Sequence, residues 1–299
     1  MAFTQPDPSQ TDAEMPQPIR RIVLFSLDGL ISAVALHRLV KRLDGRVVAV
    51  VASQRYGGKY GSFWAQFVRN YRRSGWDFVT YLGLLLLWFR PAIAVARVIN
   101  KLLGRPDSAI SLSKLVQTYD IPVIRTREPN DDAVIGRLHA LEPDLFVVAY
   151  FDHVIRAPLI AVPKRGVINI HSALLPDLRG PFPAFWALLR DARPVGVTVH
   201  GIVDENNDTG PIIQQQKINP SPEASVLTLD CELMRAGADL AIETIEALQR
   251  GGAEFTPQQP GAGSYDPYPS RDDVAALKKT GRRLFTLSDF FQQVFGLRQ

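Results

Sequence analysis

Two polar residues near the middle of the chain could carry acid–base chemistry. Val167 to Ile170 is a β-branched run of strand length, and side chains in a strand alternate between two faces, so Asn169 and His171 project on the same side. The residues after His171 are rich in leucine, proline and glycine, so the strand ends in a loop there. Open α/β sheets bind ligands at this carboxyl end of their strands. An isolated Asn-x-His is also typical of satisfied polar groups in a core, so the pattern needs support from elsewhere in the chain.

That support comes from a carboxylate further along the chain. The segment 195–216 is predicted to form an apolar strand, a polar loop and a second apolar strand, and Asp208 lies in an Asp-Thr-Gly turn of that loop. Gly210 in the turn permits a backbone conformation that a β-branched residue would resist. An amide, an imidazole and a carboxylate on neighbouring loops form a candidate acid–base constellation.

The order of these motifs resembles one known family. Asn169 to Ser172 is followed by Leu174-Leu175-Pro176, by Arg179-Gly180 and by Asp208 to Ile213. This ordered set is similar to the catalytic core of the folate-dependent formyltransferases, a superfamily that includes glycinamide ribonucleotide, methionyl-tRNA and sugar-nucleotide formyltransferases. The resemblance runs from about Ile121 to Leu248. It implies an α/β fold with a Rossmann-like, doubly wound, mostly parallel sheet.

The resemblance also implies a reaction and a role for each polar residue. The formyl group of 10-formyltetrahydrofolate would pass to a primary amine. Asn169 would donate to the developing oxyanion, an interaction that elsewhere lowers the barrier by roughly 3–4 kcal/mol. His171 would stabilise the oxyanion as an imidazolium or shuttle the amine proton. Asp208 would orient His171, raise its pKa and organise a water, and which of the two first receives the proton stays open.

A further implication of the resemblance is a folate pocket after the predicted strand 144–149. Family members hold the pteridine ring there through backbone groups. His153 could alternatively act as a second catalytic base, although a residue lining the folate site is favoured. A histidine in the strand before Asp208 would support the same pocket. The residues assigned to binding the co-substrate are Tyr150, Phe151, Asp152, His153, Val154, Ile155, His200, Asn206 and Asn207.

Three other functions fit part of the pattern. A 10-formyltetrahydrofolate hydrolase would share the three polar residues, but the hydrolases carry an N-terminal regulatory domain for which residues 1–20 are too few. A non-catalytic binding protein on the same scaffold would have no physical need to retain all three. A dinucleotide-dependent oxidoreductase would need a glycine-rich turn that Ser26 to Gly29 does not supply.

Composition predicts one sizeable domain without a metal. The chain has 299 residues, 46% of them hydrophobic, which is ample for a large core. Its one cysteine, Cys231, excludes an intramolecular disulfide, fits a reducing compartment and is expected to pack in the core. No Cys/His cluster has metal-ligand spacing. Residues 1–20 lack the features of a secretory signal and are expected to form a disordered leader, which favours a cytoplasmic location.

Strand and helix patterns alternate along the rest of the chain, as a parallel sheet requires. Strands are expected over 21–27, 46–52, 121–124 and 144–149, and helices over 30–43, 131–141, 182–190 and 225–250. The charged residues of the last helix are expected to form a solvated face. The catalytic domain is therefore placed at 21–250, with a helical insertion over 53–120.

The segment 251–299 is left as a C-terminal extension. It contains Tyr265 and Tyr268 and is expected to pack a helix or two near the acceptor cleft. It is too short for the β-barrel domain that methionyl-tRNA formyltransferases carry after their catalytic core. A small or sugar-like amine is therefore the expected acceptor, and no nucleic acid partner is expected.

The insertion is unusually basic and contains an apolar run. Between Ser53 and Arg105 there is one acidic residue, Asp77, against nine basic residues: Arg55, Lys59, Arg69, Arg72, Arg73, Arg90, Arg97, Lys101 and Arg105. Phe78 to Phe89 is apolar and is expected to end at Arg90-Pro91. The run is too short to cross a bilayer alone, because a span needs about twenty residues.

Two interpretations of the insertion are compatible with this pattern. Apolar helices with flanking cations, and with aromatic residues near their edges, suit a membrane interface; the aromatic residues here are Trp76, Tyr81 and Trp88. This interpretation places the protein at the inner face of the membrane and suggests an acceptor amine carried on a lipid. The alternative is a helical hairpin that packs on its own domain or forms a homodimer interface, with its basic residues solvated.

Overall fold

A computed structural model describes residues 18–54, 61–104 and 111–295 of the chain. Almost all of the expected leader, 1–20, lies outside these ranges, as do three of the basic residues of the insertion, Arg55, Lys59 and Arg105. The domain boundaries drawn from the sequence therefore stay predictions.

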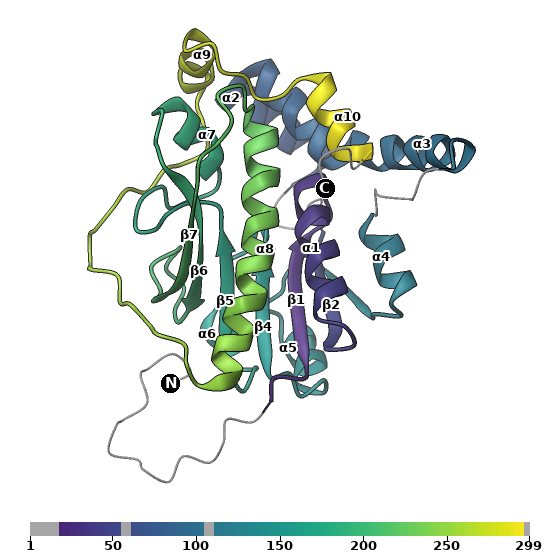
Figure 1. Ribbon diagram of the computed structural model, residues 1–299, viewed down its shortest axis with the longest axis vertical. Coiled ribbons are helices and arrows are strands. Elements are labelled where there is room, and N and C mark those ends of the chain that lie inside the picture. The colour runs from purple at the N-terminus through teal and green to yellow at the C-terminus, as the bar shows by residue number, and fades with distance from the viewer. Residues whose placement is uncertain (1–17, 55–60, 105–110, 296–299) are drawn as a thin grey trace.

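A seven-stranded sheet forms the centre of the fold, in the order β3-β2-β1-β4-β5-β6-β7 (Figure 1). The first five strands pair in parallel, whereas β6 pairs antiparallel with β5 and β7 pairs antiparallel with β6. This confirms the predicted doubly wound, mostly parallel α/β fold. The strands are β1 (Ile22–Leu27), β2 (Val47–Ser53), β3 (Val123–Thr126), β4 (Leu145–Ala149), β5 (Val167–His171), β6 (Val195–Ile202) and β7 (Ile212–Ile218).

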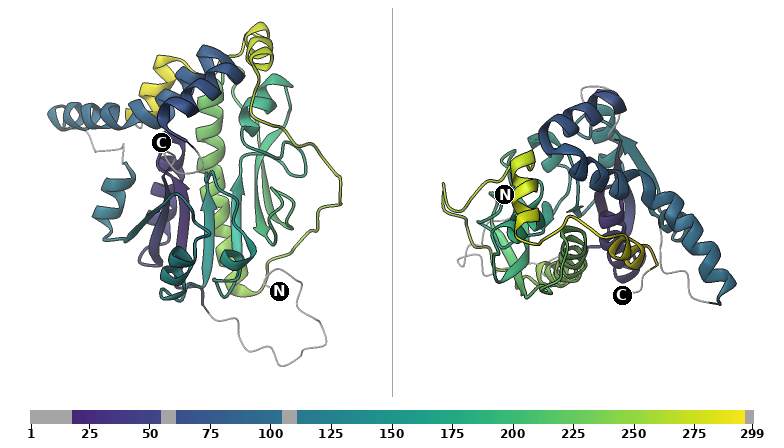
Figure 2. Two further views of the ribbon diagram at one scale, coloured as in Figure 1. Left: turned by 180° about the vertical axis from the view of Figure 1, so that it is seen from behind. Right: turned by 90° about the horizontal axis from the view of Figure 1, so that it is seen from above.

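Helices cover both faces of the sheet, because the central strands are apolar on both sides. In β1, Ile22 and Leu24 join the core on one face, while Val23 and Phe25 join the core on the other. The first face carries α1 (Leu30–Arg42) and α8 (Val226–Arg250). The opposite face, seen from behind in Figure 2, carries α5 (Asp132–His139) and α6 (Ala157–Ile160).

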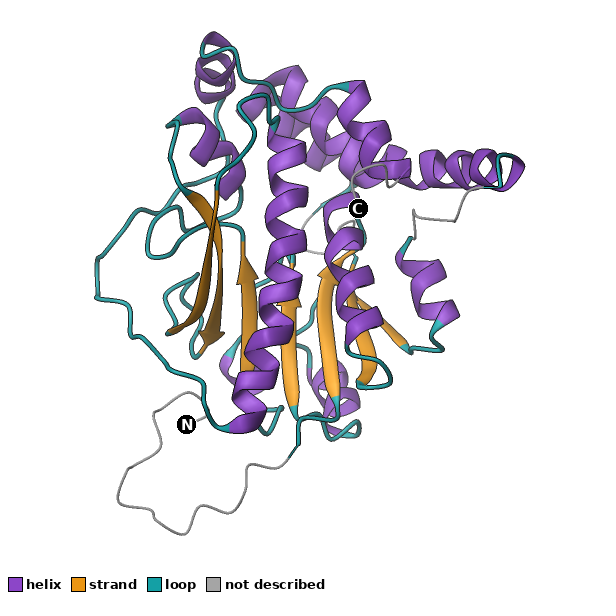
Figure 3. Cartoon of the chain, in the orientation of Figure 1, coloured by secondary structure: helices purple, strands orange, loops and turns teal. Residues whose placement is uncertain are grey.

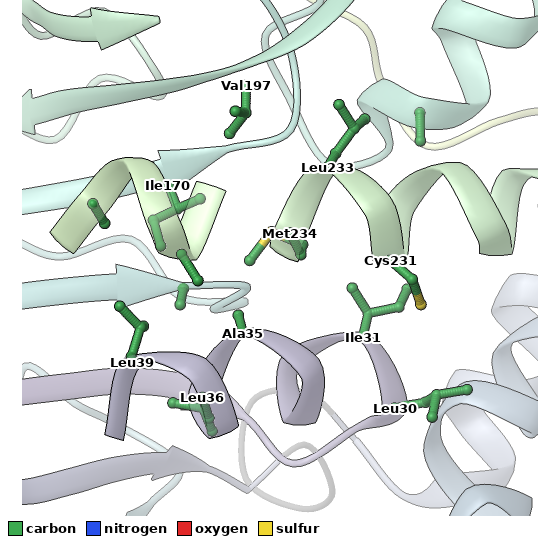
Figure 4. Packing of buried hydrophobic residues seen from close by; sticks show 14 of the residues in the cluster. Leu30, Ile31, Ala35, Leu36, Leu39, Ile170, Val197, Cys231, Leu233 and Met234 are labelled. Carbon is green, nitrogen blue, oxygen red and sulfur yellow. The ribbon is translucent and has the colours of Figure 1, made fainter. Parts of the chain in front are cut away.

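Helix α8 packs closely against α1 and the sheet (Figure 4). A Cβ atom at Gly237 would lie 2.3 Å from Cγ2 of Ile170, so only glycine allows α8 to approach β5 so closely. Cys231 is a free, fully buried thiol in this core, which confirms its predicted packing role. The tight packing of α8 fixes the position of its amino-terminal turns above the ends of β4 and β5.

The chain order reverses between β1 and β4. From β1 the sheet continues to β2 and β3 on one side, and it resumes with β4 and β5 on the other. The arrowheads of these strands point the same way in Figure 3, so their carboxyl ends form one edge. Ligands of open α/β sheets bind outside this edge at such a switch point, so the topology alone places a site after β1, β4 and β5.

The insertion is helical, as predicted, and it contains one break within α2. The helical run consists of α2 (Phe63–Gly83), a wider π-helical turn at η2 (Leu84–Trp88) and α3 (Phe89–Leu102), followed by α4 (Leu112–Thr118). The apolar run ends at Arg90-Pro91 as the sequence indicated, but the helix continues through Pro91 in the first turn of α3, which follows the π-helical turn η2 directly. The break falls at Gly75, whose φ of 80° only glycine adopts readily.

The C-terminal extension packs against the insertion. It contains α9 (Arg271–Lys279) and α10 (Leu287–Phe295), which lie beside α2 and α3 beyond the carboxyl ends of the strands (Figure 1). Lys278 forms a 2.9 Å salt bridge with Asp77. The ring of Tyr81 stacks on Phe285 with centroids 6.2 Å apart. Insertion and extension therefore form one helical layer over the edge of the sheet at which the topology places a site.

Candidate active site

A pocket of about 410 Å³ opens at the carboxyl ends of β1, β4 and β5. Its lining includes Leu27 at the end of β1, Tyr150 after β4 and His171 at the end of β5. Each residue that the sequence assigned to catalysis or co-substrate binding lines this one pocket: Asn169, His171, Asp208, Tyr150, Phe151, Asp152, His153, Val154, Ile155, His200, Asn206 and Asn207. The structure thus brings together the whole predicted set, from four separate segments of chain.

The register between β5 and β6 places Asn169 directly opposite His200. Directly opposed residues of an antiparallel pair share a face, so the two side chains meet, with the Asn169 nitrogen 3.0 Å from Nε2 of His200. Nδ1 of His200 lies 3.0 Å from the carbonyl oxygen of Gly201. A carbonyl only accepts, so Nδ1 carries the proton and, in neutral His200, Nε2 accepts from Asn169. The second N–H of the Asn169 amide remains for a ligand.

His171 is held in a similar way on the same strand face. Its Nε2 atom donates to the carbonyl oxygen of Leu178 at 3.0 Å, which leaves Nδ1 facing Oδ1 of Asp208 at 3.5 Å. Burial lowers the pKa of His171 below its ordinary value of 6.5, and the opposing influence of Asp208 is too small to reverse it. Asp208 acts to raise this pKa, as predicted, but the burial of His171 has the larger effect. Neutral His171 is a base, with the free electron pair of Nδ1 directed at Asp208.

Asp208 lies between the two histidines. Its Oδ1 atom is 3.5 Å from Nδ1 of His171 and 3.5 Å from Nε2 of His200, and its Oδ2 accepts from the backbone N–H of Gly180 at 3.0 Å. Burial by itself would raise the pKa of the Asp208 carboxyl, but His171, His200 and the Gly180 amide together hold it well below its ordinary value. The carboxylate is therefore ionised at neutral pH.

The backbone of the Asp208 turn differs from the expectation. The residue with a positive φ is Asp208 itself, at 57°, and not Gly210. A Cβ atom at Gly210 would lie 1.9 Å from the carbonyl oxygen of Gly201, so glycine is needed there for close approach to β6. The side chain of Gln258 donates to the carbonyl oxygens of Asp208 and Gly210 at 2.9 and 2.7 Å and holds the turn in place.

The loop after β4 forms the other end of the pocket. Tyr150 has a φ of 56°, which turns the chain sharply so that the residues after it line the pocket. The Nε2 atom of His153 is 2.9 Å from the hydroxyl of Ser53, at the end of β2. This contact holds His153 against β2, on the far side of β1 from β5, which favours the predicted lining role over that of a second base.

A buried carboxyl in the same pocket escaped the sequence interpretation. Asp230 lies in the second turn of α8, and the prediction that the charged residues of this helix are solvated is wrong for it, because it is buried. Its Oδ2 atom accepts from the hydroxyl of Tyr150 at 3.4 Å, and Oδ1 has no hydrogen-bond partner among the described residues. Burial outweighs the interactions with Ser172 and Tyr150 and raises the pKa of Asp230 to about 7.

The extension closes the pocket on the side of α7 (Pro183–Leu189). Its segment 264–268 is attached to the loop after β5, where the N–H of Arg179 donates to Ser264 and the N–H of Asp266 donates to Arg179, at 2.9 and 2.7 Å. Arg190 pairs with the buried Asp266. Tyr265, Pro267 and Tyr268 line the pocket as a result. We call segment 264–268 the strap. The extension was expected to pack a helix or two near the cleft, and the strap itself was not predicted because no local pattern reveals it.

Within the described residues, no group of His, Cys, Asp and Glu is arranged to hold a metal ion. The pocket instead combines an amide donor, a neutral imidazole, an ionised carboxylate and a protonatable carboxyl. Such a set can stabilise a developing negative charge and move protons.

The fold and this pocket define an open α/β protein with an acid–base site at its switch point. A family model described as formyl transferase matches residues 96–245, which is half of the chain. The chain therefore belongs to the formyl transferase family, as the motifs around Asn169, His171 and Asp208 indicated.

Two curated relatives are methionyl-tRNA formyltransferases. The protein from Roseiflexus sp. (strain RS-1) is 34% identical over 170 residues, which cover 57% of this chain and 52% of the relative. The protein from Thermodesulfovibrio yellowstonii is 33% identical over 185 residues, covering 62% and 59%. The chain thus spans little more than half the length of the curated relatives it matches.

Solved structures share the fold at low sequence identity. Glycinamide ribonucleotide transformylase 1 from Symbiobacterium toebii superposes with a TM-score of 0.53 at 18% identity, over 81% of this chain and 95% of that chain. WlaRD, a sugar 3N-formyl transferase crystallised in the presence of dTDP and 5-N-formyl-THF, gives 0.52 at 17% identity, over 84% and 71%. These similarities extend the shared fold beyond the segment that the family model matches.

Proposed function

We propose that this protein transfers the formyl group of 10-formyltetrahydrofolate to the primary amine of a small or sugar-like acceptor. The observation that carries the proposal is the convergence of Asn169, His171 and Asp208 in one pocket, each held by a second group. Membership of the formyl transferase family supports the reaction class.

The pocket is suited to a folate on physical grounds. Its volume of about 410 Å³ falls in the range of roughly 300–1,000 Å³ that is common for small-molecule sites. Apolar side chains of Leu27, Val148, Phe151 and Ile155 line the end at β1 and β4, where a flat ring system would be held. The polar groups of Asn169, His171 and Asp208 lie at the β5 end, where the formyl group would be presented.

The formyl donor supplies a carbonyl carbon that an amine attacks, with formation of a new C–N bond and cleavage of the bond to the folate nitrogen. In this chain, Asn169 directs its second N–H at the oxygen on which negative charge develops. His200 holds the Asn169 amide in that orientation and is a positioning residue. Removing one such oxyanion donor typically costs roughly 10²–10³ in turnover.

The amine proton must leave as the C–N bond forms. Nδ1 of neutral His171 and the ionised Asp208 face each other across 3.5 Å, so a proton received by the pair is shared between a nitrogen and an oxygen. The same proton can then pass to the folate nitrogen as its bond to the formyl carbon breaks, which balances the reaction. In the resting site His171 is neutral, because burial disfavours its cation. When His171 takes the proton during the reaction, the charge of Asp208 stabilises the imidazolium.

The acceptor is the less constrained part of the proposal. The two curated relatives bear the name methionyl-tRNA formyltransferase, so methionyl-tRNA is the competing acceptor. The strap favours the proposal of a small acceptor, because its residues Tyr265, Pro267 and Tyr268 line one side of the pocket. The expectation of a small acceptor without nucleic acid stays a prediction.

A direct assay tests both parts of the proposal. The protein is incubated with 10-formyltetrahydrofolate and, in parallel, with amino-sugar nucleotides, small primary amines or methionyl-tRNA. Mass spectrometry follows the formylated acceptor, and absorbance follows the released tetrahydrofolate. A formylated small amine is expected. Formylated methionyl-tRNA would replace the acceptor, tetrahydrofolate release without any acceptor would indicate a hydrolase, and no turnover in any mixture would overturn the proposal.

A further inference from the structure

The helical insertion exposes an apolar surface that the rest of the chain leaves uncovered. Trp64, Trp76 and Trp88 are 69%, 64% and 64% exposed, and Leu102 is 80% exposed. We call this the aromatic ridge; it comprises the exposed apolar residues of α2, η2 and α3, namely Phe63, Trp64, Val68, Tyr71, Trp76, Leu87, Trp88, Val95, Val98, Ile99 and Leu102. Soluble proteins seldom leave three tryptophans and so many aliphatic side chains in water, so the ridge indicates an interaction surface.

Helix α3 has two apolar sides, and only one of them is buried in the protein. Phe89, Ile93 and Ala96 are buried, at the three- and four-residue spacing of one helix face, and α3 packs against α10. Trp88, Val95 and Leu102, each seven residues apart, lie on another face and are exposed. In Figures 1 and 2, α3 extends sideways beyond the body of the molecule, which keeps this second apolar side open.

The first half of α2 repeats the pattern with aromatic side chains. Phe67 contacts Trp64, Tyr71 and Trp76, with ring centroids 5.7, 6.5 and 6.1 Å apart, so the aromatic rings form one cluster across the break at Gly75. Arg69 is about half a helical turn from the side that carries Trp64 and Tyr71, and it is exposed. A helix with an aromatic face opposite a cationic face is characteristic of segments that lie in the plane of a membrane interface.

The charges of the insertion fit an anionic surface. Its described helices, 63–102, contain one acidic residue, Asp77, and six basic residues: Arg69, Arg72, Arg73, Arg90, Arg97 and Lys101. Asp77 already pairs with Lys278 of α9, and Arg90 pairs with Asp28 after β1. Positive charge is still in excess along the insertion, and cationic side chains are attracted to anionic lipid.

The helical run 63–102 passes a test of length and composition for a membrane span. The run is 40 residues long, and an 18-residue stretch of it has a mean hydropathy of 1.8 and is 22% buried in the protein. The sequence analysis counted only the twelve-residue apolar run and therefore underestimated the length of helix that is apolar enough to span. Several observations argue against crossing. The run is broken at Gly75, and Phe78, Tyr81, Phe89 and Ile93 are buried in the core that the insertion shares with the domain. A helix tied to its own domain along one side can lie on a bilayer but cannot enter it lengthwise.

We propose that the aromatic ridge docks on the surface of an anionic phospholipid bilayer, with the indole and aliphatic side chains inserted at the level of the headgroups. Tryptophan is enriched at this level in membrane proteins because its ring has an apolar body and a polar N–H. The neighbouring arginine and lysine side chains contact the lipid phosphates. The expected location at the inner, cytoplasmic face of the membrane stays a prediction.

Helix α2, which carries part of the aromatic ridge, also contacts residues at the pocket. Arg73 of α2 lies over the ring of Tyr268 at 4.0 Å, and the ring of Phe78 packs on Phe182 at 5.1 Å, where both Tyr268 and Phe182 line the pocket. The hydroxyl of Ser74 donates to the carbonyl of Pro269, next to the same strap. Docking therefore holds the mouth of the pocket close to the bilayer. If the proposed formyl transfer is correct, the acceptor class that this geometry favours is an amine carried on a lipid headgroup.

Flotation with vesicles tests the docking without any readout of activity, so it stands or falls separately from the proposed function. The full chain is mixed with vesicles of phosphatidylcholine, or of phosphatidylcholine with phosphatidylglycerol, at low and high salt, and is then centrifuged through a density gradient. We expect flotation with the anionic vesicles at low salt and reduced flotation at high salt, because salt screens the cationic contribution.

Two single substitutions and a matched control locate the contact. Trp88→Glu and Leu102→Glu place a carboxylate on the ridge at exposed positions, so the protein should fold while its partitioning falls at least about tenfold. Val203→Glu is the control: Val203 is 51% exposed and lies outside the insertion, directly after β6. It should float like the wild type.

Other outcomes would overturn the docking. Failure to float with either vesicle, together with a dimer in analytical ultracentrifugation that Trp88→Glu dissociates, would make the ridge an interface between two copies. Protein that stays with the vesicles after high salt and alkaline carbonate would instead contain a spanning segment. Equal flotation of wild type and both ridge variants would place any lipid contact elsewhere on the chain.

Discussion

The side-chain nitrogen of Asn169 donates to Nε2 of His200 across 3.0 Å, from directly opposed positions of β5 and β6. Because Nδ1 of His200 donates to Gly201, the imidazole orients the amide without contacting the reacting atoms. His200→Phe should therefore lower kcat by roughly tenfold to a hundredfold through a misplaced oxyanion donor, with a smaller change in KM. His200→Gln, which retains a group that can accept from Asn169, should recover part of the loss. Equal kcat values in both variants and the wild type would remove His200 from the positioning role.

His171 and Asp208 should carry the proton transfer. His171→Ala or Asp208→Ala is expected to lower turnover by at least about a hundredfold, because positioned acid–base groups typically contribute roughly 10²–10⁴. Circular dichroism and a melting curve check that each variant folds. His153→Ala is the matched control, since His153 lines the same pocket but is bound to Ser53; it should change KM more than kcat. Near-normal turnover in the His171 or Asp208 variant would contradict the assignment.

The pH dependence of turnover follows from the states of the same pair. Burial lowers the pKa of His171 below 6.5, and the neighbouring histidines hold the pKa of Asp208 well below 3.8. The pair is then in its basic form at neutral pH and loses that form only as His171 takes a proton. Turnover should fall on acidification with a midpoint below 6.5. An acid limb centred above 6.5 would mean that Asp208 dominates the pKa of His171 after all.

Local patterns predicted the elements that carry the site, and tertiary contacts account for what they missed. The β-branched run ending at His171 and the alternation of side chains correctly placed Asn169 and His171 on one face, because both depend only on neighbours in sequence. Asp230 was assigned to a solvated face because α8 is amphipathic, yet the ends of β4 and β5 cover that turn of the helix. Similarly, Gly210 is required by the approach of Gly201, a contact that no turn pattern encodes.

Folate binding should be measurable without turnover and without a metal. A tetrahydrofolate analogue at a hundredfold excess over its Kd adds about 2.7 kcal/mol to the free energy of unfolding. For a chain of this size that corresponds to a rise of several degrees in Tm. Dialysis against EDTA should leave both the Tm shift and the activity unchanged. Loss of activity on dialysis, restored by a divalent cation, would show that a metal takes part.

Asp230 should make the stability of the fold depend on pH in an unusual direction. Its pKa is raised from 3.8 to about 7 by burial, so between these values the folded state keeps a proton that the unfolded state has lost. The free energy of unfolding therefore decreases as the pH rises from about 4 to about 7, by at most about 4 kcal/mol at roughly 1.4 kcal/mol per unit, and is constant above that range. Asp230→Asn removes the ionisation and keeps the shape of the protonated acid. The variant should match the wild type near pH 4 and exceed its stability at pH 8, as measured by urea unfolding.

A second substitution on the same helix separates this effect from a general change of charge. Glu243→Gln removes a carboxylate from an exposed position of α8, so it should shift the urea midpoint by a similar small amount at both pH values. The difference between the Asp230 and Glu243 variants then isolates the cost of ionising a carboxyl whose Oδ1 has no hydrogen-bond partner in the described part of the chain. If Asp230→Asn gained nothing at pH 8 relative to pH 4, the carboxyl would have to be ionised and stabilised in the folded protein, and burial would not be its dominant influence.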